Sequence, residues 1–496
     1  MRDLSTSPNG NDGDRNRRRG TRRVDAGASR PLHQAANQDP RRHRSQPARQ
    51  DQRRAAQRAQ HAQPQPQGNR RRSTPMPQIP DAAQQRSAAR RSAVARRKPT
   101  GRLSAIIPAF IAMAVVAVLA VGGLTASCNA PADQTAADAS AETETAQVVQ
   151  PTSVHFVAVG DNLPEEQIGA WADAQAGTTG DGLYDYTTLY APIKSYIESA
   201  DLAYVKEETH CGGDDIGPKG YPSFNTTDAM ADAIVSTGFD LVASASNHSY
   251  DWGYFGANDH SCELWKTKDV VFAGTADCAD DAAKIATIEK NGITFALLDY
   301  TYGVNGYEQS DLPSYAVNFI DKDRIASDVA AAKQQADVVL VAMHWGTENL
   351  MEADETQLEY AQYLADLGVD VVLGSHPHVI GPMRWVEGKD GNQTLVAYSL
   401  GNFVSRHEAP SPKNELEGML SCDFVRAEDG TVSVQNVVWT PLVNHTDGET
   451  FAVYALKDYT NELAAQDSVF SELDDPCAWL KQTSEDVVGG GFDIDA

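Results

Sequence analysis

Short apolar runs recur between residues 154 and 410, and each ends in polar or charged residues. Runs of about four to eight residues with polar ends are typical of strands that are buried on both faces. Seven segments have this form: VHFVAVGD (154–161), DLAYVKEE (201–208), FDLVASAS (239–246), ITFALLDY (293–300), ADVVLVAMHWG (336–346), VDVVLGSH (369–376) and TLVAYSLGNF (394–403).

Helix signals lie in the intervals between these strands. Asp228 can cap a helix that ends near Gly238, and Asp321 begins a second one. Asp354 caps a third helix, which stops before Gly368. Strands that alternate with helices predict an α/β domain.

The last part of the chain has a different pattern. MLSCDFVRAEDGTVSVQNVVWTPL (419–442) predicts a β-hairpin with its turn at 428–430. Residues 455–480 predict a helix, and a glycine-rich acidic tail follows it. We therefore expect a main domain over residues 154–445 and a C-terminal helix with its tail over 446–496.

The segment before this domain contains one long apolar run. Residues 103–127 carry no charge and are long enough to cross a bilayer as a helix. Arg96, Arg97, Lys98 and Arg102 precede the run, so the positive-inside rule places the N-terminus in the cytoplasm and the main domain outside the cell membrane. We expect an uncleaved single-pass anchor, with residues 128–153 as a linker. Lipidation of Cys128 is an alternative, although Thr125 stands where a lipobox has leucine.

Charge divides the chain unequally. Residues 1–102 contain 25 Lys and Arg against 7 Asp and Glu, whereas the remainder contains 17 against 61. The first segment is also poor in aliphatic residues, so we predict that it is disordered. Its charge suits contact with anionic lipid or nucleic acid, or it serves only to fix the membrane orientation.

Five cysteines lie in the segment after the predicted linker. An exported domain permits disulfides, and Cys262–Cys278 is the favoured pair, with Cys422–Cys477 as a weaker one. Cys211 is the fifth cysteine, and the odd number leaves at least one thiol without an intrachain partner.

Polar residues with metal-ligand chemistry stand at the ends of the predicted strands. In α/β sheets such residues collect at the carboxyl edge, where ligands bind. A set of carboxylates, imidazoles and an amide suits Mn²⁺, Zn²⁺ or Fe. The residues are Asp161, Glu208, Asn247, His248, His344, His376, His378 and Asn402. In extended geometry, the rings of His376 and His378 would project to the same side.

The motifs that carry these residues resemble one known family. VAVGDN, YVKEET, TGFDLVASASNHSYDWG, VVLVAMHWGTE, GVDVVLGSHPHVIGPMRW and VAYSLGNFV are similar to the motifs of CapA proteins, over residues 154–410. CapA proteins are associated with poly-γ-glutamate capsule synthesis and related to calcineurin-like metallophosphoesterases. The resemblance implies a four-layer αββα sandwich and a membrane-anchored extracellular protein.

The resemblance also implies roles for individual residues. It makes Asp161, Glu208, Asn247, His344, His376 and His378 ligands of a divalent centre, expected to hold two ions, with Glu208 between them. His248 would be the catalytic acid/base and Asp251 would orient its ring.

Two positions depart from the expected pattern. Leu163 replaces a histidine that phosphoesterases carry, and Lys206-Glu207-Glu208 replaces an Asn-Leu-Glu motif. The second departure leaves open which of the two glutamates is the ligand.

Three functions are consistent with these observations. The first is a hydrolase or amide transferase acting on an anionic extracellular polymer of the poly-γ-glutamate type. The second is a metallophosphoesterase for an envelope phosphoester, and the third is a non-catalytic polymer anchor among the membrane subunits of a capsule-synthesis complex. An acidic domain needs a local basic lining to bind a polyanion. The candidate substrate-binding residues are Arg384, Asn402 and Arg406, and Lys206 and Lys219 are further cations near the motifs.

Overall fold

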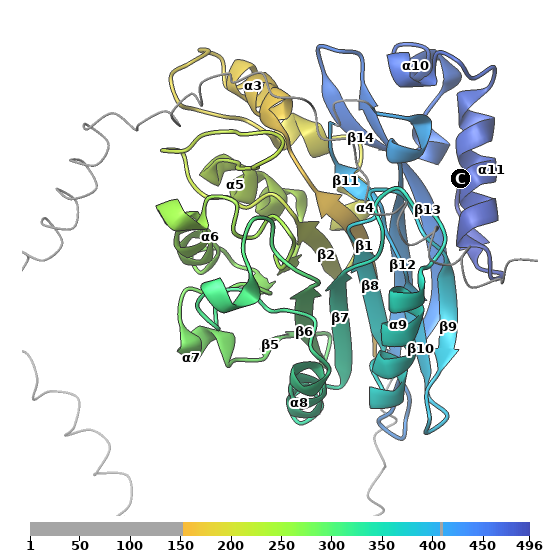
Figure 1. Ribbon diagram of the computed structural model, residues 1–496. Helices are drawn as coiled ribbons and strands as arrows, with labels where there is room; N and C mark the ends of the chain where they lie inside the picture. Colours follow the sequence, from red (N-terminus) through yellow and green to blue (C-terminus); the bar gives the residue numbers. More distant parts are fainter. Residues whose placement is uncertain (1–151, 407–409) are drawn as a thin grey trace, which may run out of the picture. The chain divides into compact units, whose positions relative to one another are not determined.

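Two β-sheets packed face to face form the centre of the computed structural model, which describes residues 152–406 and 410–496 (Figure 1). The predicted tail, the apolar run at 103–127 and nearly all of the linker lie outside the described residues. Among the residues that are described, no helix is long and apolar enough to span a membrane.

The first sheet combines parallel and antiparallel strands. Its parallel part contains β1, β2, β3, β4 and the short β11, and its antiparallel part begins where β12 pairs with β1. In spatial order the described strands are β14 (Phe451–Ala455), β13 (Val432–Thr446), β12 (Leu416–Arg426), β1 (Ser153–Asn162), β2 (Leu202–Glu207), β3 (Leu241–Ala243) and β4 (Val271–Ala273), with β11 (Asn402–Val404) beside β1 and β15 (Asp493–Ile494) beside β13.

The second sheet has a parallel centre with an antiparallel strand at each edge. In spatial order its strands are β5 (Ala286–Lys290), β6 (Ile293–Thr301), β7 (Val338–His344), β8 (Val371–Ser375), β10 (Gln393–Ala397) and β9 (Met383–Glu387). The predicted strand at 394–403 is thus two strands, β10 and β11, which belong to different sheets.

Alternation of side chains along the strands explains the layers. On β1, Val154, Phe156 and Ala158 point into the core between the sheets, whereas Val157 and Val159 point to the outer face. The strands β6 and β7 alternate in the same way between the central core and the outer face of the second sheet. These three strands are therefore apolar on both faces, which is why the sequence of each is a nearly continuous apolar run.

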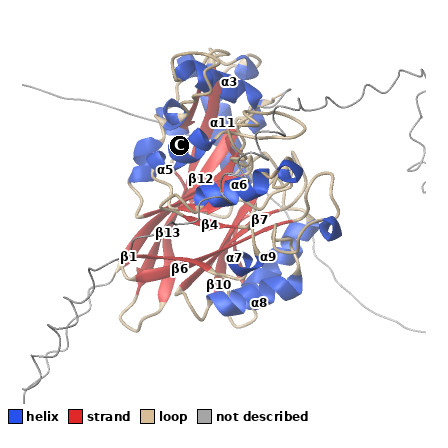
Figure 2. Ribbon diagram, turned by 90° about the vertical axis from the view of Figure 1, so that its left-hand side faces the viewer, coloured by secondary structure: helices blue, strands red, loops and turns tan. Residues whose placement is uncertain are grey.

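Helices cover both outer faces. The first sheet is covered by α3 (Glu166–Gln175), α4 (Lys194–Glu198), α5 (Asp228–Thr237) and α6 (Ala257–Trp265). The second sheet is covered by α8 (Lys322–Ala332) and α9 (Glu355–Leu367). Figure 2 shows the strands lying between helices. The order of helices, sheet, sheet and helices agrees with the four-layer sandwich expected from the resemblance.

The predicted helix starts are largely confirmed. The Asp321 side chain caps α8 by accepting from the backbone N–H of Arg324. Asp354 forms a capping box with Gln357 at the start of α9. The cap of α5 is Thr227, one residue before the predicted Asp228.

Residues after 445 belong to the same packed unit, in contrast to the predicted separate helix and tail. β14 and β15 both pair with β13, and between them lie α10 (Asn461–Ala464) and α11 (Pro476–Val488). Leu480 and Val488 of α11 join the core between the sheets. Short strands such as β15 carry too few residues to show a periodic pattern in the sequence.

Candidate metal centre

The polar residues predicted at strand ends meet at one edge of the two sheets. Asp161 and Glu208 come from the ends of β1 and β2 in the first sheet, and His344 and His376 come from the ends of β7 and β8 in the second. The backbone N–H of His376 donates to Asp161 Oδ2 at 2.9 Å, so this contact joins the two sheets.

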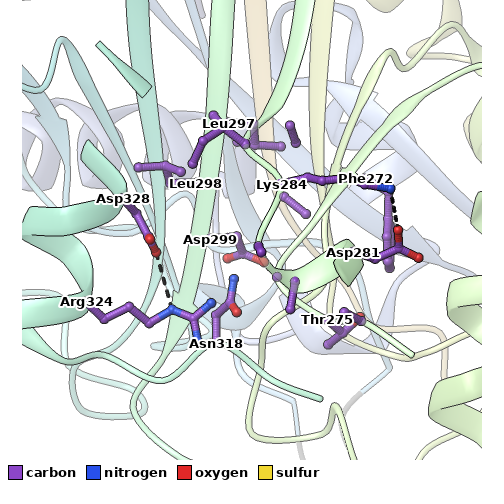
Figure 3. A pocket seen from close by; sticks show the side chains of 17 residues that line it. Phe272, Thr275, Asp281, Lys284, Leu297, Leu298, Asp299, Asn318, Arg324 and Asp328 are labelled. Atoms are coloured by element: carbon purple, nitrogen blue, oxygen red, sulfur yellow. Dashed lines mark hydrogen bonds and ion pairs between the residues drawn. The ribbon is translucent and has the colours of Figure 1, made fainter. Parts of the chain in front are cut away.

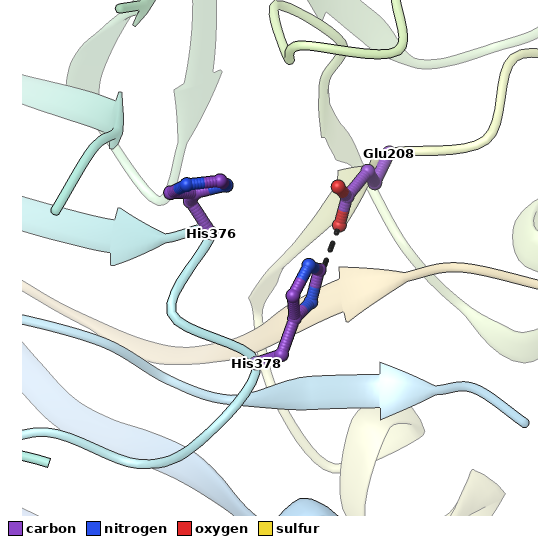
Figure 4. Close-up of side chains that lie close together, drawn as sticks. All are labelled: Glu208, His376 and His378. Carbon is purple, nitrogen blue, oxygen red and sulfur yellow. Dashed lines mark ion pairs between the residues drawn. The ribbon is translucent and has the colours of Figure 1, made fainter. Parts of the chain in front are cut away.

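Glu208 lies at the centre of the group. One ligand atom from each of Glu208, His376 and His378 lies within 4.8 Å of the others, and all three residues are buried (Figure 4). Neither carboxylate oxygen of Glu208 has a hydrogen-bond partner. They lie 3.6 Å from His344 Nε2 and 3.9 Å from His378 Nδ1, beyond hydrogen-bond length. A buried carboxylate with this spacing to imidazole nitrogens has the arrangement that a cation between them would satisfy.

Asp161 presents a second free carboxylate oxygen to the same region. Its Oδ1 has no hydrogen-bond partner and lies 3.8 Å from His344 Nδ1. Burial, and then the charge of Glu208, raise the pKa of Asp161 to about 8, and burial raises the pKa of Glu208 to about 7. Without a cation, two such carboxylates repel each other, so the donor set favours bound positive charge.

His344 and His376 are held in the neutral form that binds metals. Burial, and then the neighbouring His378, lower the pKa of His376 to about 3, and burial lowers that of His344 well below its ordinary value. His344 Nε2 lies 2.7 Å from Asn247 Oδ1, and its Nδ1 lies 2.9 Å from Ser375 Oγ. Ser375 can therefore orient the ring so that Nε2 faces Asn247 and Glu208.

The His376-Pro377-His378 segment differs from the extended geometry expected from its sequence. His376 has φ of 95° and His378 has φ of 56°, both in the left-handed region. Tertiary contacts hold this backbone: Asp161 accepts from the N–H of His376, and Pro377 O accepts from the N–H of Asn349 at 2.7 Å. Such strain persists where the surrounding structure requires it, as is common at functional sites.

His248 and Asp251 form the predicted dyad. His248 Nδ1 lies 2.7 Å from Asp251 Oδ2, which also accepts from the N–H of Phe224 at 2.8 Å. Burial acts to lower the pKa of His248, but the hydrogen bond and charge of Asp251 outweigh it, so the pKa is raised. The ring of Phe224 packs edge-on against His248 at 4.5 Å. His248 is thus oriented and disposed to carry a proton.

The ambiguity between the two glutamates is resolved by the side to which each points. Glu207 points away from the histidines and accepts hydrogen bonds from Trp265 Nε1 at 3.0 Å and from the N–H of Cys211 at 3.1 Å. Glu208 is therefore the carboxylate that faces the histidines, and Glu207 is a buried acceptor beneath α6.

The predicted substrate-binding residues are not gathered in one place. Asn402 Oδ1 lies 2.8 Å from His378 Nδ1, so it positions that ring. Arg384 donates to the carbonyl of Val488 at the end of α11. Arg406 is half-buried, and its charge acts on Glu415. The structure does not bring the two arginines to the histidines.

Lys206 does not line an approach to the site. It is fully buried and pairs with Asp299 of β6 at 2.7 Å. Asp299 also lines a cavity of about 60 Å³ together with Asn318, Arg324 and Asp328 (Figure 3). The lining of that cavity includes none of the six predicted ligands.

Sequence reasoning missed two residues at the end of β6. Asp299 pairs with Lys206, and Tyr302, which is half-exposed, packs on the ring of His376 at 4.7 Å. Both belong to the segment LLDYTYG, which closes a predicted strand, so the strand-end rule applied to the other strands also points to them.

The predicted disulfides are wrong: all five described cysteines are free. Cys262 is buried in α6 with Sγ 3.7 Å from Thr275 Oγ1. Cys422 is buried in the core between the sheets, and the thiol of Cys477 instead lies 3.6 Å from the carbonyl of Tyr459.

Comparisons with known proteins agree with the motifs. The curated relatives include the PGA biosynthesis protein CapA of Bacillus subtilis (strain 168), which is 34% identical over 169 residues, covering 34% of this chain and 42% of that protein. The capsule biosynthesis protein CapA of Bacillus anthracis is 29% identical over 179 residues, covering 35% of this chain and 41% of that protein. The chain thus spans less than half the length of these relatives.

Solved structures also resemble this chain at low identity. A hypothetical protein from Thermus thermophilus has a TM-score of 0.34 at 14% identity, covering 58% of this chain and 99% of that one. The NAD nucleotidase of Haemophilus influenzae has a TM-score of 0.37 at 11% identity, covering 68% of this chain and 67% of that one.

The family comparison covers the whole region that carries the site. The profile of the bacterial capsule synthesis protein PGA_cap matches residues 155–407, slightly more than half of the chain and all the predicted ligands. This chain therefore belongs to the bacterial capsule synthesis protein PGA_cap family.

Proposed function

We propose that this protein is a divalent-metal-dependent hydrolase or amide transferase that acts on a γ-glutamyl polymer during capsule biosynthesis. One observation carries the proposal: three buried carboxylate oxygens of Asp161 and Glu208 lack hydrogen-bond partners and face the imidazoles of His344 and His378. Family membership and the names of the Bacillus relatives support a capsule polymer as the substrate.

The residues that would hold the metal are those predicted: Asp161, Glu208, Asn247, His344, His376 and His378. A pair of divalent ions in such a site supplies Lewis acidity and a nucleophile drawn from water near neutral pH. Glu208 would be the central ligand of such a site, because its two carboxylate oxygens face His344 and His378 respectively.

The chain's own residues then provide the remaining chemistry. His248 donates a proton to the departing amine, and Asp251 keeps the ring oriented for that transfer. Asn402 holds the ring of His378, and Ser375 holds that of His344. In a transferase reaction, His248 takes a proton from the entering amine by the reverse of the same step.

We also propose that residues 103–127 anchor the protein in the cell membrane with this domain outside. The proposal is supported by the uncharged run and by the basic residues that precede it. An external location would place the site where a capsule polymer is released or attached.

The experiment uses the full-length chain, stripped with a chelator and reloaded with Mn²⁺, Zn²⁺ or Fe²⁺. Metal content is measured together with the length of poly-γ-glutamate chains after incubation, with and without an acceptor amine. His376→Ala should abolish turnover, while His260→Ala should retain it. His260 pairs with Asp228 at the partly exposed surface and is a matched control.

Each alternative has its own outcome. Metal-dependent hydrolysis of a phosphodiester without any change in polymer length would replace the proposal by a metallophosphoesterase. Polymer binding without stoichiometric metal and without turnover would indicate the non-catalytic anchor.

A further inference from the structure

Lys206 and Asp299 form an ion pair in the interior directly behind the candidate metal centre. Lys206 lies on β2 of the first sheet, two residues before Glu208, and Asp299 lies on β6 of the second sheet. Lys206 Nζ is 2.7 Å from Asp299 Oδ1, and both side chains are fully buried. Ionised groups are costly to bury, so a pair in this position calls for a reason beyond stability.

The pair holds the backbone of one residue, Ala245, through the two peptide groups that flank it. Lys206 Nζ donates to the carbonyl of Ala245 at 2.5 Å, and Asp299 Oδ2 accepts from the N–H of Ala245 at 2.6 Å. The packing leaves no room beside it: a Cβ on Gly274 would lie 2.1 Å from Asp299 Oδ2 and 2.5 Å from the nitrogen of Ala245. Residue 245 is therefore fixed at both of its backbone polar groups.

Ala245 begins the turn that carries two residues of the site. Asn247 and His248 follow it after Ser246. Within this turn, Ser246 Oγ donates to the carbonyl of Glu208 at 3.2 Å and accepts from the N–H of His248 at 3.1 Å. The position of Ala245 consequently sets where Asn247 and His248 stand relative to Glu208.

We propose that Lys206 and Asp299 are positioning residues of the metal centre: together they clamp Ala245 and thereby hold Asn247 and His248 in register with Glu208. This inference rests on the proposed function and adds a use for the lysine that departs from the family's Asn-Leu-Glu motif. The clamp links the sheets at the point where each supplies ligands, so its loss displaces ligands of one sheet from those of the other.

The test compares three variants of the full-length chain: Lys206→Met, Asp299→Asn and the double variant. Each single change leaves one buried charge without its partner, so both thermal stability and Mn²⁺ affinity should fall. The double change removes both charges, which restores stability as is common for neutralised buried pairs. It does not restore the clamp, so Mn²⁺ affinity should remain about 10–100-fold below that of the wild type.

A second ion pair provides a matched control. Lys290 of β5 binds Asp240 at 2.7 Å and also joins the two sheets, and Asp240 likewise accepts a backbone N–H, that of Ala203. This pair lies at the start of β3, whereas Ala245 follows its end. Lys290→Met/Asp240→Asn should leave Mn²⁺ affinity unchanged.

Hydrogen exchange of the segment 244–248 separates this inference from the proposed function. If the wild type binds no Mn²⁺, the proposed function fails, but the clamp still predicts faster exchange of this segment in the Lys206→Met/Asp299→Asn variant and not in the control. If the double variant recovers Mn²⁺ affinity together with stability, or if exchange is unchanged, the pair is only structural and the inference is overturned.

Discussion

The backbone N–H of His376 donates to the carboxylate of Asp161 across 215 residues of sequence, at 2.9 Å. This single bond ties the first predicted ligand to the strained segment that carries the last two. It leaves Asp161 Oδ1 free of hydrogen-bond partners and directed toward His344. The roles of these carboxylates can be tested through metal affinity and through the pH dependence of stability.

The two adjacent glutamates should respond differently to the same substitution. Glu208→Gln removes a charge that faces the imidazoles, so Mn²⁺ affinity should fall. Loss of a residue that only supports a ligand typically lowers metal affinity about 10–100-fold, and the loss in Glu208→Gln should be larger. Glu207→Gln should keep Mn²⁺ binding and change only stability, because Glu207 contacts Trp265 and Cys211. Calorimetric titration of both variants checks this. Loss of binding in Glu207→Gln alone would reverse the assignment.

Removing either member of the His248–Asp251 dyad should slow turnover without removing metal. His248→Asn takes away the proton carrier, and the expected loss in kcat is about 10²–10⁴-fold. Metal content measured on the same preparation should equal that of the wild type. His260→Asn removes an imidazole from a similar pair at the surface and should retain full activity. An active His248→Asn variant would show that another group carries the proton.

The stability of the metal-free protein should fall as pH rises from about 6.5 to 8. The pKa values of Asp161 and Glu208 are raised to about 8 and about 7, so the folded state binds their protons more tightly than the unfolded chain does. Their contribution is complete below the unfolded pKa near 4 and falls by up to about 1.4 kcal/mol per pH unit for each group until pH passes the folded pKa, about 7 for Glu208 and about 8 for Asp161.

The titration of His376 changes the folding stability in the opposite direction, at lower pH. Its pKa is lowered to about 3, so stability is lost as pH falls below about 6.5, where only the unfolded chain takes up the proton. Above pH 6.5 the contribution of His376 is constant, and His248, whose pKa is raised, acts in the same direction as the carboxyl groups, so the Asp161 contribution is identified by its substitution. Urea unfolding in a chelator at several pH values checks the slope, and Asp161→Asn should reduce it. A slope unaffected by that substitution would contradict the assignment.

Gly374→Ala adds only one methyl group but should still destabilise the protein strongly. A Cβ on Gly374 would lie 2.1 Å from the carbonyl oxygen of Tyr398, a backbone atom that cannot move aside easily. Overpacking of this kind costs about 1–3 kcal/mol. Gly303→Ala is the control, because a Cβ at that position meets no atom within 4 Å. Equal unfolding midpoints for the two variants would contradict this prediction. They would show that β8 and the backbone at Tyr398 can move apart without a loss of stability.

The strands, the helix starts and the group of polar residues that meets at the sheet edge could be predicted because they depend on local signals. An apolar run of strand length, a capping aspartate before a helix and a polar residue at a strand end are each visible within a few residues. The convergence of the ligands followed from one general property of parallel sheets, that their carboxyl ends share an edge.

The remaining features depend on contacts between distant segments. Which of Glu207 and Glu208 faces the histidines depends on the orientation of β2, and the sequence of two adjacent acids does not show it. The partner of Lys206 lies 93 residues away in another sheet. The positive φ of His376 is held by Asp161 and, through Pro377, by Asn349, so local preferences predicted the wrong backbone conformation there.

The division of the ligands between the sheets has a consequence for how the protein matures. Asp161, Glu208 and Asn247 come from the first sheet, and His344, His376 and His378 come from the second. During synthesis the first three emerge long before the others, so a nascent chain cannot assemble the centre piece by piece. Any ion that the centre holds would therefore be drawn from the compartment that the chain occupies when both sets of predicted ligands have folded together.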